Sequence, residues 1–272
     1  MEERKVEGRS LESRLQILLE RRRTNATLRC LTLPKPHHID FSSNDFLSLS
    51  KSDELKVAYK AELQKTTLPL GSGGSRLLDG NSAYAEDLER DIASFHGAEA
   101  GLLFNSGYDA NAGFFACVPQ SGDVIVYDEL VHASVHDGMR LCRAAKTISF
   151  SHNSISDLRR ILDDLIKAGG TLGQNRPNVI VALEAIYSME GDVAPLKEVV
   201  EEMDEVLGIG KGYIVVDEAH STGVLGPRGR GLVNELGLED RVFARLHTFG
   251  KSLAANGGEC RLDTRGRTLQ ND

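Results

Sequence analysis

Short apolar runs alternate with amphipathic segments along most of the chain, and this alternation predicts the fold. The apolar runs that predict strands are residues 101–104, 123–127, 147–150, 178–183, 212–216 and 242–248. Segments with helical spacing are residues 84–96, 110–118, 134–144, 155–168 and 196–207. Strands that alternate with helices in this way predict an α/β fold, in which helices cover both faces of a mostly parallel sheet.

The two ends of the chain follow other patterns. Residues 10–23 predict an amphipathic helix, residues 29–39 an extended polar connector, residues 39–47 a short strand entering a turn, and residues 70–80 a glycine-rich loop. After Gly258 the residues show no strand or core pattern. We therefore predict an N-terminal helix and connector (1–40), a large domain (41–258) and an unrelated tail (259–272).

Composition argues against several classes of protein. The formal net charge of −8, without a basic stripe that contains aromatic residues, argues against nucleic-acid binding. No apolar run is long enough to span a bilayer, and the first residues lack the apolar core of a signal peptide. The four cysteines are widely spaced and form no Cys-x-x-Cys pair, which indicates a reducing compartment and no structural zinc. We expect a cytoplasmic protein that binds neither nucleic acid nor a membrane, with organellar targeting left open.

Polar side chains that can carry chemistry follow several predicted strands. Asp128, Glu184, Asp217 and Lys251 each lie just past the end of an apolar run. Ligands of parallel sheets bind at the carboxyl ends of the strands. We therefore expect these four side chains to lie along one edge of the sheet.

Asp217, His220 and Lys251 suit pyridoxal phosphate (PLP), which needs an amine for its aldehyde and a carboxylate for its ring nitrogen. Asp217 would hold that nitrogen protonated through a charge-assisted hydrogen bond, and His220 would reach the phenolic oxygen. Lys251 lies between Gly250 and Ser252, and small neighbours leave room for a ring. Taken singly, each residue has a simpler interpretation: a turn cap, a surface histidine and an exposed lysine.

Other segments could hold the rest of such a cofactor. Residues 70–76 resemble a phosphate-binding loop but have the spacing of neither a P-loop nor a dinucleotide fingerprint, and a flexible linker would look similar. Residues 105–111 run from a strand into a helix, whose first N–H groups suit an anion. His132 could stack on a planar ring and Ser188 could supply a hydroxyl, although helix and turn capping explain these residues as well.

Seven motifs, taken in order, carry a family resemblance. They are Ser-Asn-Asp-Phe-Leu (43–47), Gly-Ser-Gly-Gly-Ser-Arg (71–76), Ser-Gly-Tyr-x-Ala-Asn (106–111), His-Ala-Ser (132–134), Tyr-Ser-Met-Glu-Gly-Asp (187–192), Asp-Glu-Ala-His-Ser-Thr-Gly (217–223) and Thr-Phe-Gly-Lys (248–251). Over about residues 10–258 the chain resembles the α-oxoamine synthases, PLP enzymes with the type I aminotransferase-like fold. Members condense an amino acid with an acyl thioester and lose carbon dioxide, in a site between two subunits, so the resemblance implies a homodimer.

The resemblance also implies a role for each matching residue. Lys251 would form the covalent link to PLP and later move protons at the α-carbon, Asp217 would pair with the pyridinium nitrogen, and His132 would stack on the ring. The remaining matches are His220 and Ser188 on the oxygen side of the ring, Gly107, Tyr108 and Thr248 at the phosphate, Asn44 near the substrate carboxylate and Arg29 at the acyl substrate.

Two features refine and limit this interpretation. The segment leading to Arg29 is similar to the biotin-pathway member, which joins alanine to a pimeloyl thioester, while glycine C-acetyltransferase and 5-aminolevulinate synthase activities stay open. Phe46 stands where the family usually has tyrosine. The family continues beyond Gly258 with a strand and a small domain that carries a substrate-binding arginine. We therefore expect a truncated form without turnover; the alternative is a module that only binds PLP.

Overall fold

The computed structural model describes residues 10–33, 35, 37–65, 71–168 and 177–263. The chain divides into two compact units, one up to Ser42 and one from Ser43 onward. In the first unit, helix α1 (Leu11–Thr24) confirms the helix expected over residues 10–23. The Ser10 hydroxyl caps this helix by accepting from the Ser13 N–H at 3.1 Å.

The prediction of a short strand over residues 39–47 is wrong, because the described residues there form bends and turns. Aspartate side chains accept hydrogen bonds from nearby backbone N–H groups, which are then not available for pairing in a β-sheet. Asp40 accepts from the Ser42 N–H at 3.1 Å, and Asp45 accepts from the Ser50 N–H at 3.3 Å.

The second unit is built around one seven-stranded sheet. Its strands are β1 (Ala100–Phe104), β2 (Val124–Asp128), β3 (Lys146–Phe150), β4 (Val179–Glu184), β5 (Gly212–Asp217), β6 (Val242–Thr248) and β7 (Gly258–Leu262), in the order β1-β7-β6-β5-β4-β2-β3. Every pair from β6 to β3 is parallel, and β7 runs antiparallel to both of its neighbours. The prediction of a mostly parallel sheet is therefore confirmed.

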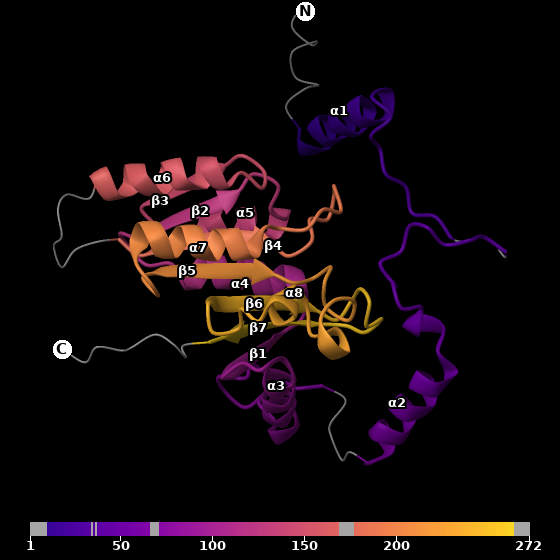
Figure 1. Cartoon of the computed structure of the whole chain (residues 1–272). Helices are drawn as coiled ribbons and strands as arrows, with labels where there is room; N and C mark the ends of the chain where they lie inside the picture. Colours follow the sequence, from indigo (N-terminus) through magenta and orange to yellow (C-terminus); the bar gives the residue numbers. More distant parts are fainter. Residues whose placement is uncertain (1–9, 34, 36, 66–70, 169–176, 264–272) are drawn as a thin grey trace, which may run out of the picture. The chain divides into compact units, whose positions relative to one another are not determined.

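Helices cover the sheet on both faces, as Figure 1 shows. The helices of this unit are α2 (Asp53–Lys65), α3 (Ala83–His96), α4 (Gly107–Cys117), α5 (Ala133–Leu141), α6 (Ile155–Ala168), α7 (Leu196–Leu207) and α8 (Leu232–Leu236), with 3-10 turns η2 (Leu49–Lys51) and η3 (Pro227–Gly229). Alternate residues of the central strands feed two separate cores. Val126, Val181 and Val216 pack with α6 and α7, whereas Ile125, Ile180 and Val215 pack with α4 and α5.

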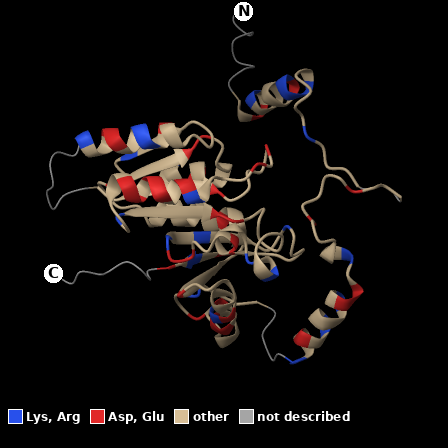
Figure 2. Ribbon diagram, viewed as in Figure 1, with Lys and Arg blue, Asp and Glu red and all other residues tan. Residues whose placement is uncertain are grey.

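The two cores are built from apolar side chains, and the buried carboxylates Asp128, Glu184 and Asp217 lie at the ends of strands. In Figure 2 the strands β4 and β5 are largely tan, while α6 and α7 carry blue and red segments. Three of the parallel strands, β2, β4 and β5, end in red, because the last residue of each is a carboxylate. Among the described helices, none is long and apolar enough to cross a membrane.

Strand β7 corrects the expectation that the residues after Gly258 have no strand or core pattern. Residues Gly258–Leu262 lie between β1 and β6, and Cys260 packs into the core beside α4. On the opposite face, Arg261 donates to Glu259 at 2.9 Å, and both side chains are buried. Two charges within five residues hide this strand in the sequence, because a buried strand is expected to be apolar. The rest of the predicted tail, residues 264–272, lies outside the described residues.

Room for the buried pair comes from β1. A Cβ on Gly101 would lie 1.9 Å from Oε1 of Glu259, so only glycine fits opposite this carboxylate. Burial raises the pKa of Glu259 to about 8 and lowers the pKa of Arg261 to about 8. Burial therefore disfavours the charged forms of both Glu259 and Arg261.

Candidate functional site

The predicted site residues meet at one cavity of about 200 Å³ at the carboxyl edge of the sheet. The residues that line it are Ser106, Gly107, Tyr108, Asn111, His132, Glu184, Asp217, Ala219, Leu246, His247, Thr248 and Lys251. Five separate connections contribute to this lining, namely the segments that follow β1, β2, β4, β5 and β6. The parallel sheet thus gathers side chains that lie far apart in the sequence.

Lys251 lies in the loop between β6 and β7. Within this loop the Phe249 N–H donates to the Gly257 carbonyl at 3.0 Å, and the Ala255 N–H donates to the Phe249 carbonyl at 2.8 Å. The Ser252 hydroxyl donates to the Thr222 carbonyl, which fixes the loop against the segment after β5. The lysine is therefore held beside Asp217 and His220 by backbone contacts on both sides.

The Lys251 amine donates to Nε2 of His220 at 2.8 Å. Burial lowers the pKa of Lys251, against the opposing attraction of Asp217 and Glu184. Burial, helped by Lys251, also lowers the pKa of His220 to about 4. At neutral pH the imidazole is therefore uncharged and can accept this hydrogen bond.

Asp217 is buried at the end of β5 and held by two donors. The Asn111 amide donates to Oδ2 at 2.6 Å, and the Ala219 N–H donates to Oδ1 at 2.9 Å. Both donors stabilise the ionised carboxylate and fix its orientation in the cavity. Such a carboxylate can hold a protonated ring nitrogen.

Glu184 at the end of β4 is a second buried carboxyl group of the cavity. Its Oε2 accepts from the Ser188 N–H at 3.1 Å, while its Oε1 has no hydrogen-bond partner among the described residues. Burial, with the nearby negative charge of Asp217, raises the pKa of Glu184 to about 8. Near neutral pH the carboxyl group of Glu184 is therefore mostly protonated.

The end of the cavity formed by α4 suits an anion. Ser106 caps the helix by accepting from the Asp109 N–H at 3.0 Å, and the described hydrogen bonds leave the N–H groups of Gly107 and Tyr108 without an acceptor. A Cβ on Gly107 would lie 2.8 Å from Cβ of Thr248, so glycine lets this helix start approach β6 closely. N–H groups at a helix start, beside a threonine hydroxyl, can hold a phosphate.

His132 is fixed at the start of α5. Its Nδ1 accepts from the Ser134 N–H at 3.2 Å and lies 2.7 Å from the Ser134 hydroxyl. The edge of the Tyr108 ring meets the imidazole at a centroid distance of 5.9 Å. The ring is therefore held at the cavity wall by both its own helix and α4.

Four predicted site residues do not line the cavity. His220 is one of them, and it reaches the site through its 2.8 Å contact with Lys251. Ser188 is exposed, and its backbone N–H rather than its hydroxyl reaches the site through Glu184. Asn44 is exposed, although the neighbouring Phe46 ring lies 5.9 Å from the His220 ring. Arg29 is exposed in the first unit, outside the unit that forms the cavity. Within the second unit the structure thus gathers most of the predicted cofactor residues at the cavity, whereas Asn44 lies outside its lining.

Asn111 and His247 line the cavity without having been predicted as site residues. Asn111 lies four residues after Gly107, one helical turn along α4, so its position on the cavity face follows from helical spacing. His247 lies near the end of β6, where its Nδ1 meets the Thr222 hydroxyl at 2.8 Å. Burial lowers the pKa of His247 to about 3, and only the position at a strand end could have indicated it.

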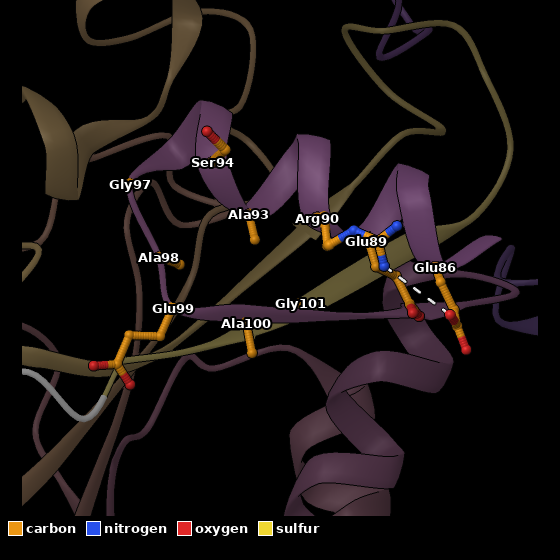
Figure 3. A pocket seen from close by; sticks show the side chains of 10 residues that line it. All are labelled: Glu86, Glu89, Arg90, Ala93, Ser94, Gly97, Ala98, Glu99, Ala100 and Gly101. Carbon is orange, nitrogen blue, oxygen red and sulfur yellow. Dashed lines mark ion pairs between the residues drawn. The ribbon is translucent and has the colours of Figure 1, made fainter. Parts of the chain in front are cut away.

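A larger hollow of about 560 Å³ lies between α3 and β1, away from this site. Figure 3 shows its lining, with Glu86 and Arg90 paired on α3 and Glu99 at the start of β1. None of the predicted site residues lines it. In the part of the chain that the structure describes, no group of three or more His, Cys, Asp or Glu side chains is placed to hold a metal ion.

Comparisons with known proteins agree with this geometry. Residues 36–264 match the family Aminotransferase class I and II. The chain is 56% identical over 259 residues to the 8-amino-7-oxononanoate synthase of Emericella nidulans, covering 94% of this chain and 63% of that protein.

Solved structures give the same result. A serine palmitoyltransferase from S. paucimobilis with bound PLP and myriocin matches with a TM-score of 0.77 and 28% identity, over 94% of this chain and 66% of that one. The 8-amino-7-oxononanoate synthase of Francisella tularensis matches with a TM-score of 0.66 and 26% identity, over 84% of this chain and 59% of that one. The chain thus spans less than two thirds of the length of each of these relatives.

Proposed function

The chain belongs to the aminotransferase class I and II family and, within it, to the PLP-dependent α-oxoamine synthases, and from this we propose a specific reaction. The reaction is the condensation of L-alanine with a pimeloyl thioester, with release of carbon dioxide and the free thiol. The observation that carries the proposal is the cavity itself, where Lys251, Asp217 and the start of α4 face one another. The choice of substrates rests on the 56% identity to the Emericella protein.

The residues of the cavity fit PLP. Bound PLP supplies an electron-withdrawing ring that stabilises negative charge on the α-carbon of an amino acid. Asp217, held in place by the Asn111 amide and the Ala219 N–H, would hold the ring nitrogen protonated. The close approach of Gly107 to Thr248 leaves the helix-start N–H groups for the phosphate.

Lys251 would attach the cofactor and move a proton at the α-carbon. Both tasks need the uncharged amine, and burial favours that form by lowering the lysine pKa. His220 would keep the amine in place through the 2.8 Å contact until the substrate displaces it. His132 would cover one face of the ring, because its orientation is set by the N-cap geometry.

Arg29 and Asn44 are proposed at the acyl and carboxylate ends of the substrates, and two copies of the chain are proposed to complete the site as a homodimer. Glycine C-acetyltransferase or 5-aminolevulinate synthase activity is the sister alternative.

The experiment is a substrate comparison. The chain, extended with the part of the Emericella protein that lies beyond the match and supplied with PLP, is assayed for free CoA with L-alanine and pimeloyl-CoA, and in parallel with glycine and acetyl-CoA or succinyl-CoA. We expect kcat/KM to favour alanine with pimeloyl-CoA. A clear preference for either glycine pair would assign a sister activity instead.

A second candidate is a PLP-binding module without turnover. One observation favours it: the cavity is lined by cofactor residues, and Asn44 does not belong to its lining. The same assay is therefore run on the 272-residue chain alone and on the chain extended with the part of the Emericella protein that lies beyond the match. PLP bound by both proteins, with CoA released only by the extended one, is the result this candidate requires.

A further inference from the structure

His152 lies between two carboxylates in the loop between β3 and α6. Its Nδ1 is 2.9 Å from Oδ1 of Asp128, and its Nε2 is 2.8 Å from Oδ2 of Asp192. The edge of the ring also packs on Tyr187, at a centroid distance of 4.5 Å and an angle of 89°. These contacts join three loops at the carboxyl edge of the sheet.

The protonation of this ring follows from its two contacts. A neutral imidazole has one N–H donor and one bare nitrogen, and a carboxylate can only accept. One of the two contacts would therefore place a lone pair against a carboxylate oxygen. Both contacts are attractive only when the ring is an imidazolium, which donates to Asp128 and Asp192 together.

We propose that His152, as an imidazolium, is a positioning residue that fixes the two loops carrying His132 and Ser188 at the cofactor site. The inference rests on the proposed function for the meaning of that site. His152 touches neither cofactor nor substrate in this proposal. It acts through Asp128 on one side and Asp192 on the other.

Asp128 links the histidine to the loop that leads to His132. This carboxylate is fully buried and accepts from the Leu130 N–H at 2.9 Å and from the Asn153 N–H at 2.8 Å. It thereby shapes the turn two residues before His132. Loss of the imidazolium would leave a buried charge without its cation, and such a charge is strongly destabilising.

Asp192 links the histidine to the loop after β4. Its side chain also accepts from the Asn153 amide at 2.7 Å, and its backbone carbonyl accepts from the Tyr187 N–H at 3.0 Å. The bridge between Ile186 and Val193 closes this loop around Ser188. The same loop places the Ser188 N–H on Glu184, at the cavity wall.

The groups around the ring are mostly acidic. They are Asp128 and Glu129 at the end of β2, Asp157 on α6, which holds the Ser151 N–H, Asp192 and Tyr187 after β4, and Glu184 beyond Tyr187. Burial lowers the pKa of His152, but the hydrogen bonds to Asp128 and Asp192 outweigh it and raise the pKa above the ordinary value. A raised pKa in the folded state stabilises the protein below the unfolded pKa, about 6.5, and this contribution is lost as the pH rises through the folded pKa.

The first test measures the ring directly in the 272-residue chain without PLP. Nitrogen-15 NMR of labelled histidine should show that the His152 ring loses its proton at a higher pH in the folded chain than in the chain unfolded in urea. Asp192→Asn removes one carboxylate and should shift the titration of folded His152 to lower pH. A His152 ring that titrates at the same pH, or at a lower pH, in the folded chain than in the unfolded chain would overturn the proposal.

The second test compares His152→Gln with His136→Gln, a half-buried histidine on α5 that packs on Tyr127. Glutamine is uncharged and has both N–H donors on one nitrogen, so it cannot replace an imidazolium that donates from two separate ring nitrogens to Asp128 and Asp192. We expect faster amide exchange at Leu130 and Asn153 and a PLP dissociation constant raised by about tenfold in His152→Gln but not in His136→Gln. In the unmutated chain, the Leu130 and Asn153 amides should also lose protection from hydrogen exchange when the pH is raised until His152 deprotonates. Amides whose exchange does not change in His136→Gln serve as the reference.

The two proposals fail in different ways. A chain that binds no PLP at Lys251 contradicts the proposed function, while the NMR and exchange results still decide the role of His152 in the loops. Unchanged exchange and unchanged PLP affinity in His152→Gln would refute the positioning role even if PLP binds as expected.

Discussion

Lys251 and His220 form a hydrogen bond of 2.8 Å between two nitrogen atoms, and neither residue has its ordinary pKa. Burial lowers the pKa of both groups, to about 4 for the imidazole. The histidine therefore accepts as a neutral ring over the physiological range. Burial thus disfavours the protonated form of the Lys251 amine, which lies in the same cavity as the Asp217 carboxylate.

Lys251→Arg should abolish covalent attachment of PLP, because a guanidinium cannot replace the amine in bond formation with the aldehyde. Borohydride reduction with PLP, followed by peptide mapping, should label Lys251 in the unmutated chain and give only background in the variant. Lys146→Arg, at an exposed strand start, should label normally. A label on another lysine would disprove the assignment.

Asn111→Ala should lower the free energy of unfolding by about 1.5–3 kcal/mol, because the buried Asp217 loses a charge-assisted donor at 2.6 Å. Urea denaturation measures the change. Asn81→Ala removes an exposed amide that donates to Glu86 at 2.7 Å, and it should change stability by less than about 0.5 kcal/mol. Equal losses in the two variants would show that Asp217 does not depend on Asn111.

Gly107→Ala should weaken PLP binding by about tenfold or more. The added Cβ would clash with Thr248, and such overpacking costs roughly 1–3 kcal/mol at the start of α4. Gly113→Ala serves as the control in the same helix, where a Cβ would lie 3.2 Å from the Phe104 ring. This second variant should keep its PLP affinity. Fluorescence titration measures the PLP affinity of both variants. Similar affinities would contradict the placement of the phosphate at the start of α4.

Glu184→Gln should flatten the dependence of stability on pH. The folded state raises the pKa of Glu184 from 4.5 to about 8, so the folded protein keeps a proton that the unfolded chain releases between these values. The free energy of unfolding therefore falls as the pH rises through this window, by at most a few kcal/mol for one group. Glutamine resembles the protonated acid and should remove that fall.

The comparison is made by urea denaturation of the chain without PLP at several pH values. Glu54→Gln, on the exposed helix α2, should leave the slope unchanged. Glu259, whose pKa also rises to about 8, should keep its own part of the fall in both proteins. An equally steep fall in Glu184→Gln and in the unmutated chain would show that Glu184 does not contribute.

The parallel core of the fold could be predicted from the sequence because each strand there is a short apolar run. Residues 155–168, 196–207 and 242–248 begin and end where the pattern predicts. The helix α2 was not predicted, since all its residues are exposed or half-buried and its apolar positions mark no core face. Strand β7 was not predicted because Glu259 and Arg261 are buried by pairing with each other, a tertiary effect that local pattern does not contain.

The cofactor side of the site could also be predicted, because strand ends place Asp217 and Lys251 at one edge. Ser188 and Asn44 do not line the cavity, since their positions depend on loops whose course is set by contacts such as those of Asp192 and Asp45. His152 was not predicted, because its two partners lie 24 and 40 residues away in sequence.

The place of β7 in the sheet also sets the order in which the protein can assemble during synthesis. Strands β2 to β6 pair with strands that are synthesised soon before or after them. In the described sheet β1 pairs only with β7, so Phe104 cannot pair until Gly258 has been synthesised. Pairings this distant along the chain form late and slow folding. The α4 start follows β1 directly, and Ser106 bridges Gly257. The anion end of the cavity is therefore completed only after almost all of the described chain has left the ribosome, so an early binding event cannot guide the folding of this site.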